Sequence, residues 1–71
     1  MATEVVAEMV GKVWKIEAEV GQQVEEEDVL IILESMKMEI PIVAPEDGTV
    51  KEIKVQVDQT VQEGEVVAIL E

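Results

Sequence analysis

The chain holds 71 residues, with 17 acidic side chains against five basic ones and a formal net charge of −12 at pH 7. A chain of this length has room for one core, so we expect a single domain over residues 1–71. So much negative charge repels phosphate backbones and anionic lipid surfaces, which excludes nucleic acid and membranes as partners.

Residue types that commonly act in catalysis are scarce. The sequence contains no His, Cys, Tyr, Asn or Arg, and Ser35 is its only serine. General bases, nucleophiles and oxyanion-binding groups are therefore mostly missing, and we expect a protein that is not an enzyme. No window approaches the roughly 20 apolar residues of a membrane span, and residues 1–10 lack the features of a secretory signal. We expect a cytoplasmic protein.

The apolar residues predict β-structure. Val and Ile supply 21 residues, and their β-branched side chains suit the pleated surface of a sheet. Short apolar segments alternate with turn residues, which predicts strands near residues 4–8, 12–17, 22–24, 29–35, 38–44, 49–55, 60–62 and 66–70. The expected fold class is all-β, with two antiparallel sheets packed as a flattened eight-stranded barrel or sandwich.

Turns are expected where residues tolerant of positive φ interrupt the strands. In chain order they fall at residues 20–24, which include Gly21, at residues 45–48, and at residues 57–61, which include Asp58. Glycine adopts a positive φ at no steric cost, and Asp tolerates it better than most residues. The turns at Gly21 and Asp58 are therefore expected to have the same backbone conformation.

Two details of the strands also follow from the pattern. Residues 29–33 are continuously apolar, which is typical of a strand covered on both faces. Val13 and Ile16 are three residues apart, so a regular strand would place them on opposite faces although both are apolar. The same spacing separates Val50 from Ile53. We expect these two strands to carry a β-bulge.

An internal repeat relates the two halves of the chain. The 24 residues that start at Gly11 align without a gap with those that start at Gly48, an offset of 37 residues, and 11 pairs are identical. The shared positions are mainly apolar residues and turn residues. Equivalent faces of the two halves are therefore expected to pack about a pseudo-two-fold axis.

Lys37 has no counterpart in this repeat, because the offset of 37 moves it beyond either end of the chain. It lies in the link between the halves, far from the chain ends in the expected symmetry. A tight turn between strands near Ser35 and Met38 would place Met36 and Lys37 at a hairpin tip, with the amine in water. The alternative is a continuous strand in which two core methionines flank one exposed lysine. The position between the repeats favours the hairpin.

Residues 34–40, with the sequence ESMKMEI, resemble the modification motif of the biotinyl/lipoyl attachment domains, specifically the biotin carboxyl carriers. The similarity covers essentially the whole chain and implies the same flattened barrel, a barrel-sandwich hybrid. It also implies that Lys37 is covalently biotinylated by a biotin protein ligase, that Met36 and Met38 are recognised by that ligase, and that Glu34 supports recognition. The resemblance makes the chain a carrier that serves biotin carboxylase and carboxyltransferase components. Some carriers of this family have a protruding thumb in the first half, and the gapless repeat leaves no room for one.

Three other interpretations remain open. Lipoyl domains share the fold, so Lys37 is alternatively a lipoate attachment site for a lipoyl ligase; Met36 and Met38 favour biotin. Residues 25–28 are consecutive acids, which allows a metal site but more often marks a solvated turn. The third interpretation is an interaction module in which Lys37 stays unmodified. Trp14 is the only aromatic residue, and we expect it to serve packing at a partly exposed position.

Overall fold

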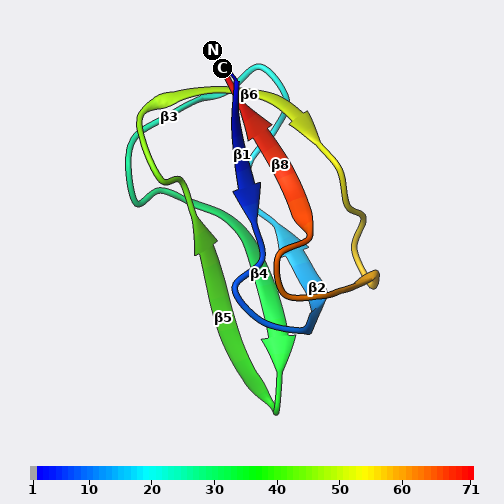
Figure 1. Cartoon of the computed structure of the whole chain (residues 1–71). Helices are drawn as coiled ribbons and strands as arrows, with labels where there is room; N and C mark the ends of the chain where they lie inside the picture. The colour runs from blue at the N-terminus through cyan, green and yellow to red at the C-terminus, as the bar shows by residue number, and fades with distance from the viewer. Residues whose placement is uncertain (1) are drawn as a thin grey trace.

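The computed structural model describes residues 2–71, which form eight β-strands (Figure 1). The strands are β1 (Thr3–Val6), β2 (Gly11–Ile16), β3 (Gln23–Val24), β4 (Val29–Ser35), β5 (Met38–Val43), β6 (Gly48–Ile53), β7 (Thr60–Val61) and β8 (Val66–Leu70). All eight predicted strands are present, and none of their ends is displaced by more than two residues. Within residues 2–71 no helix is long and apolar enough to cross a membrane.

The strands form two four-stranded antiparallel sheets, in the orders β1-β8-β6-β3 and β5-β4-β2-β7. Each sheet combines strands from both halves of the chain, and the offset of 37 residues exchanges the two sheets strand for strand. The hydrogen bonds that continue each sheet into the turns before β3 and β7 follow the same offset. Gly21 donates its N–H to the Val50 carbonyl at 2.7 Å, and Asp58 donates to the Val13 carbonyl at 2.8 Å. The all-β class and the two-sheet architecture expected from the sequence are therefore confirmed.

The core lies between the two sheets and is entirely apolar. Its largest fully buried side chains are contributed equally by the two halves: Leu30, Ile31, Leu33, Leu70, Val13, Val50, Val61 and Val67. Among the described residues no polar or charged side chain is buried. The fold is therefore stabilised mainly by removal of apolar surface from water, together with the hydrogen bonds of the two sheets.

Both predicted bulges are confirmed. The register of β2 against β4 shifts between Val13 and Lys15, which leaves Trp14 as the extra residue. The register of β6 against β8 shifts between Val50 and Glu52. A bulge lets apolar residues three apart face the same side, because the extra residue changes the alternation. Trp14 is 47% exposed, in agreement with the partly exposed position expected for it.

The prediction that residues 29–33 are covered on both faces is wrong for two of them. Val29 is 40% exposed and Ile32 is half-buried, whereas Leu30 and Ile31 are both buried. The reason is a register shift between Val29 and Ile31 in the pairing of β4 with β5. The extra residue, Leu30, faces the core beside its neighbour, so a continuous apolar run arises without a second covered face.

Four turn residues with positive φ form two pairs related by the repeat offset. Gly21 has φ 92° and Asp58 has φ 76°, as the sequence predicts. Glu27 has φ 74° and Gly64 has φ 84°, a second pair that was not predicted. Equivalent turns therefore keep one backbone conformation even where glycine is replaced by an acidic residue.

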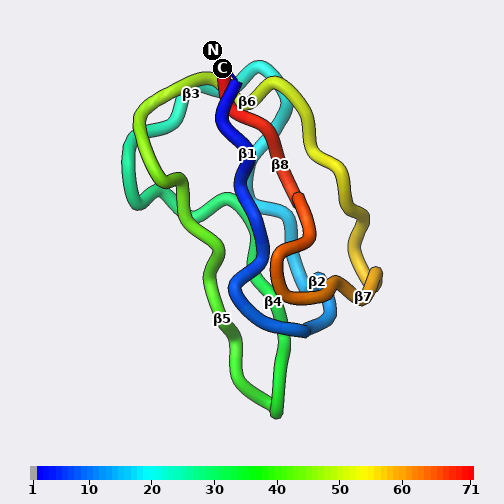
Figure 2. The backbone as a smooth tube through the Cα atoms, in the orientation of Figure 1, coloured from blue at the N-terminus to red at the C-terminus, as the bar shows by residue number. Residues whose placement is uncertain are grey.

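The molecule is elongated, with principal extents of 33 × 17 × 17 Å. The β4–β5 link lies at one end of the long axis, and the end of β8 lies at the other (Figures 1 and 2). Thr3 pairs with Leu70, so the strands nearest the two chain ends lie side by side there. The link that contains Lys37 is therefore far from the chain ends, as expected.

Candidate functional site

The β4–β5 hairpin turns through two residues, Met36 and Lys37. Ser35 pairs with Met38 at the last rung, and the strands remain paired in register down to Ile31 and Ile42. Met36 has φ 52° and Lys37 has φ 64°. Positive φ at both central residues is the signature of a type I′ turn, whose twist matches that of the flanking strands. The sequence therefore forms a tight hairpin here, and the predicted tip is confirmed.

The turn does not use the residues that favour this conformation. Type I′ turns prefer Asn and Gly, because a left-handed backbone conformation costs most other residues about 1–2 kcal/mol each. At this tip the two residues are methionine and lysine. Strain of this kind persists where the surrounding structure imposes it, and it is frequent at functional sites. Methionine and lysine thus occupy two turn positions whose backbone conformation is unfavourable for them.

The side chains at the tip extend into solvent. Met36 is 88% exposed and Met38 is 62% exposed, and Lys37 is exposed between them. The ion pairs within residues 2–71 involve Lys12, Lys15 and Lys54, and no hydrogen bond or ion pair in this part of the chain involves Lys37. Its amine is therefore accessible from several directions.

The base of the hairpin is fixed by the core. Strand β4 lies inside its sheet, between β5 and β2. Its residues Ile31 and Leu33 are completely buried, and Ile42 of β5 is 6% exposed. Close packing of this kind permits few alternative arrangements of the strands. The tip is thus an exposed turn on a rigid support.

Glu34 lies on β4 directly opposite Glu39 of β5 and is also in register with Lys12 of β2. Like charges on opposite strands are destabilising, so this acidic pair is not explained by stability. The Lys12 amine lies 3.7 Å from Asp58 and does not pair with either glutamate. Sequence reasoning found Glu34 but missed Glu39, although a two-residue turn at 36–37 requires residues 34 and 39 to be partners.

Next to the hairpin lies a hollow of about 90 Å³, which we call the β1–β5 groove. It is lined by residues of β1, the β1–β2 link, β4 and β5: Val6, Glu8, Met9, Leu33, Ile40, Pro41, Ile42 and Val43. The lining is mostly apolar. No part of this groove was found from the sequence, because it depends on two strands from different sheets lying close together.

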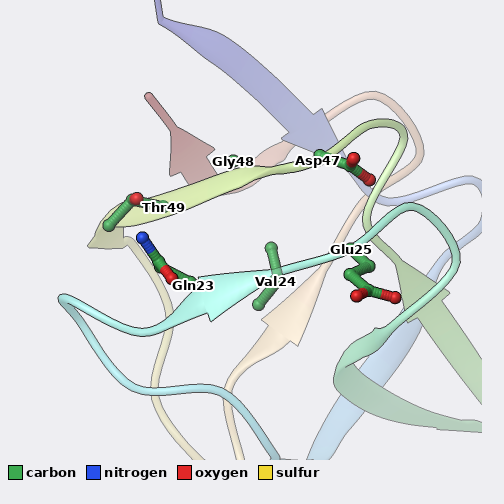
Figure 3. A pocket seen from close by; sticks show the side chains of 6 residues that line it. All are labelled: Gln23, Val24, Glu25, Asp47, Gly48 and Thr49. Carbon is green, nitrogen blue, oxygen red and sulfur yellow. The ribbon is translucent and has the colours of Figure 1, made fainter.

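A larger open hollow of about 420 Å³ lies along β3 and β6, away from the hairpin (Figure 3). Gln23 and Thr49 lie at one end of it and Glu25 and Asp47 at the other. An Asp47 carboxylate oxygen accepts a hydrogen bond from the Glu26 N–H at 2.8 Å. Within residues 2–71 no group of three or more acidic side chains is placed to hold a metal ion.

The chemistry available at the hairpin tip is that of a primary amine. Once deprotonated, such an amine is a nucleophile that forms an amide with an activated carboxyl group. The exposed turn leaves room for a partner enzyme to enclose the amine, and no neighbouring carboxylate holds it in an ion pair. The site therefore suits covalent attachment of a group that carries a carboxyl.

Comparisons with known proteins point to one family. The model of a family described as biotin-requiring enzyme matches residues 1–70. A biotin/lipoyl attachment protein of Bacillus subtilis is 54% identical over 37 residues, which cover 52% of this chain and 51% of that protein. Biotinylated protein TB7.3 of Mycobacterium bovis is 48% identical over 44 residues, which cover 62% of each. The match thus spans about half to three fifths of these relatives.

Solved structures give the same result. The Kluyveromyces lactis urea carboxylase matches with a TM-score of 0.96 and 35% identity, over 100% of this chain and 6% of that one. A single-chain, multi-domain long-chain acyl-CoA carboxylase matches with a TM-score of 0.90 and 25% identity, over 96% of this chain and 7% of that one. In both cases at least 96% of this chain corresponds to a small part of a much larger carboxylase.

Proposed function

We propose that this chain, which belongs to the family described as biotin-requiring enzyme, is a biotin carrier and that Lys37 is the residue to which the biotin is joined. The observation that carries the proposal is the position of Lys37 on an exposed two-residue turn with no ion-pair partner among the described residues. Biotin has a single carboxyl group, which fits amide formation with such an amine.

Attachment requires a partner enzyme. Lysine amines are mostly protonated near neutral pH, so an enzyme must remove a proton before the nitrogen reacts. The Lys37 Nζ then attacks the carbonyl carbon of biotinyl-adenylate, which a biotin protein ligase makes from biotin and ATP. The new C–N bond replaces the bond to the phosphate oxygen, AMP leaves, and the protons lost by the nitrogen pass to the ligase or to water. The positive charge of the lysine is lost.

Three further side chains are proposed to guide the ligase. Met36 and Met38 flank the amine with flexible apolar side chains, which adapt well to a partner surface. Glu34 lies two rungs below the turn on the same hairpin and adds a negative charge that a basic ligase surface would recognise.

The proposed partners of the loaded domain are the biotin carboxylase and carboxyltransferase components of a biotin-dependent carboxylase, in keeping with the carboxylases that share its fold. Attached biotin supplies a ureido ring that accepts a carboxyl group and later donates it. The domain contributes position, because a rigid hairpin that holds the arm raises the effective concentration of the ring at both sites. It contributes no catalytic group of its own.

The second candidate is lipoate, since one relative is named for attachment of biotin or lipoate. The relatives named as biotinylated proteins and the carboxylase structures favour biotin. Separate co-expression with a biotin ligase and with a lipoyl ligase, followed by intact-protein mass spectrometry, distinguishes them. We expect the mass of one biotin with the first and the unmodified mass with the second.

The attachment residue is tested by comparing Lys37→Arg with Lys51→Arg during biotin ligase co-expression. Lys51 is a matched control because it is exposed and forms no ion pair among the described residues. We expect Lys37→Arg to fold, as judged by circular dichroism, and to incorporate no biotin, whereas Lys51→Arg incorporates it fully. Undiminished incorporation in Lys37→Arg would show that the assignment is wrong.

A further inference from the structure

The β1–β5 groove contains more apolar residues than the equivalent place at the other end of the molecule. Val6 and Val43 are equivalent under the repeat offset and line the groove together, so the symmetry generates a corresponding place near the chain ends. There, the residues equivalent to Met9, Ile40 and Pro41 are Glu46, Thr3 and Glu4. The scaffold therefore folds with polar residues at these positions.

A row of apolar side chains connects the hairpin tip to the groove. Alternate residues of a strand face the same side, so Met38, Ile40 and Ile42 lie along one side of β5. Their burial increases along the row: Met38 is 62% exposed, Ile40 is half-buried, and Ile42 is 6% exposed. The apolar surface is thus continuous from beside Lys37 to the groove.

The distances suit a group attached to Lys37. Ile40 is three residues from Lys37, or about 10 Å along the strand. The lysine side chain and the acyl chain of biotin together contain about eleven bonds, roughly 13 Å when extended. The arm can therefore turn back and bring its ring to the near end of the groove, beside Ile40.

The chemistry of the groove also suits the ring. The bicyclic ring of biotin has a hydrocarbon and thioether side and a ureido edge with two N–H donors. Apolar side chains form most of the lining, and the exposed Glu8, which also lines the groove, supplies a carboxylate that can accept hydrogen bonds from those donors. The sulfur of Met9 adds a polarisable contact for a ring of this kind.

We infer that the β1–β5 groove is a resting site for the biotin ring, in which Met9 and Ile40 contact the ring and Glu8 accepts a hydrogen bond from the ureido group. This inference rests on the proposed attachment at Lys37. In the resting state the arm lies against the domain, and it leaves the groove when a carboxylase component binds the ring more strongly. The hollow of about 90 Å³ covers one side of the ring and leaves it free to depart.

NMR spectroscopy of the biotinylated chain tests the resting site. Intact mass and peptide mapping first establish that one biotin is attached and that it is on Lys37, and failure at that step counts against the proposed function alone. The control is the chain acetylated at Lys37, which loses the same charge but has no ring. We expect amide shifts at residues 8–10 and 40–43, and nuclear Overhauser effects from the ring to the Met9 methyl, in the biotinylated chain only.

Two variants distinguish the loss of ring contacts in the groove from a general effect of added negative charge. Met9→Glu places in the groove the residue found at the equivalent position 46, and Val57→Glu adds the same charge at a 52% exposed residue outside the groove. We expect Met9→Glu to lose the ring contacts while Val57→Glu keeps them. Spectra in which the biotinylated and acetylated chains differ only at residues 35–39 would overturn the inference.

Discussion

Replacing Met36 by glycine tests the backbone strain at the hairpin tip. Met36 has φ 52°, where an L side chain costs about 1–2 kcal/mol and glycine costs almost nothing. Glycine also increases the entropy of the unfolded chain, which offsets about 0.5–1 kcal/mol of this gain. Because Met36 is 88% exposed, little burial is lost. We expect Met36→Gly to raise the free energy of unfolding by roughly 0.5–1 kcal/mol.

The assay is urea unfolding followed by circular dichroism and by the fluorescence of Trp14. With an m-value of about 1 kcal/mol/M, the midpoint should increase by roughly 0.5–1 M. The matched control is Glu27→Gly, because Glu27 has φ 74° and its repeat equivalent, Gly64, has φ 84°. A lower midpoint for Met36→Gly beside a higher one for Glu27→Gly would refute the strain argument at the tip.

The same pair of variants separates stability from modification. If Met36 guides the ligase, Met36→Gly should be biotinylated more slowly than the parent chain although it is more stable. Glu27→Gly lies outside the hairpin and should be biotinylated at the parent rate. Equal rates for all three chains would show that the strained methionine is not retained for the ligase.

Three further outcomes are expected. Leu33→Ala removes a completely buried side chain at the base of the hairpin and should lower the free energy of unfolding by about 2–5 kcal/mol in urea titrations. Asp47→Ala removes the acceptor of the Glu26 N–H and should lower the free energy of unfolding by about 1 kcal/mol. Biotin incorporation, measured by intact mass, should not change. Glu39→Lys replaces a like-charge pair with Glu34 by an opposite-charge pair and should raise the melting temperature, most clearly at low salt.

Much of the fold could be predicted because local patterns and the repeat agree. The spacing of apolar residues predicted the strands. The three-residue separation of Val13 and Ile16 predicted a bulge in β2. The positive φ of Glu27 was not predicted, because glutamate carries no turn signal and only comparison with Gly64 indicates it. The prediction that residues 29–33 are covered on both faces was wrong, because an apolar run alone does not distinguish a strand with two covered faces from a strand with a bulge.

The candidate site was predictable to the extent that it is local. The hairpin tip at Lys37 follows from a short link between two strands, and the structure brings Glu34, Met36 and Met38 onto the same hairpin. The roles of these four residues remain predictions. The position of Met9 beside β5 was missed, because it depends on packing between segments distant in sequence.

The placement of the chain ends opposite the hairpin has a mechanical consequence. Any segment joined near Thr3 or Leu70 would hold the domain at the end farthest from Lys37. The domain is 33 Å long, and the biotin arm proposed for Lys37 would add roughly 13 Å at the end opposite that tether. Rotation of the domain about the tether would then move the proposed biotin ring through a wider arc than the arm alone allows, and the two proposed catalytic partners could be reached without bending the domain.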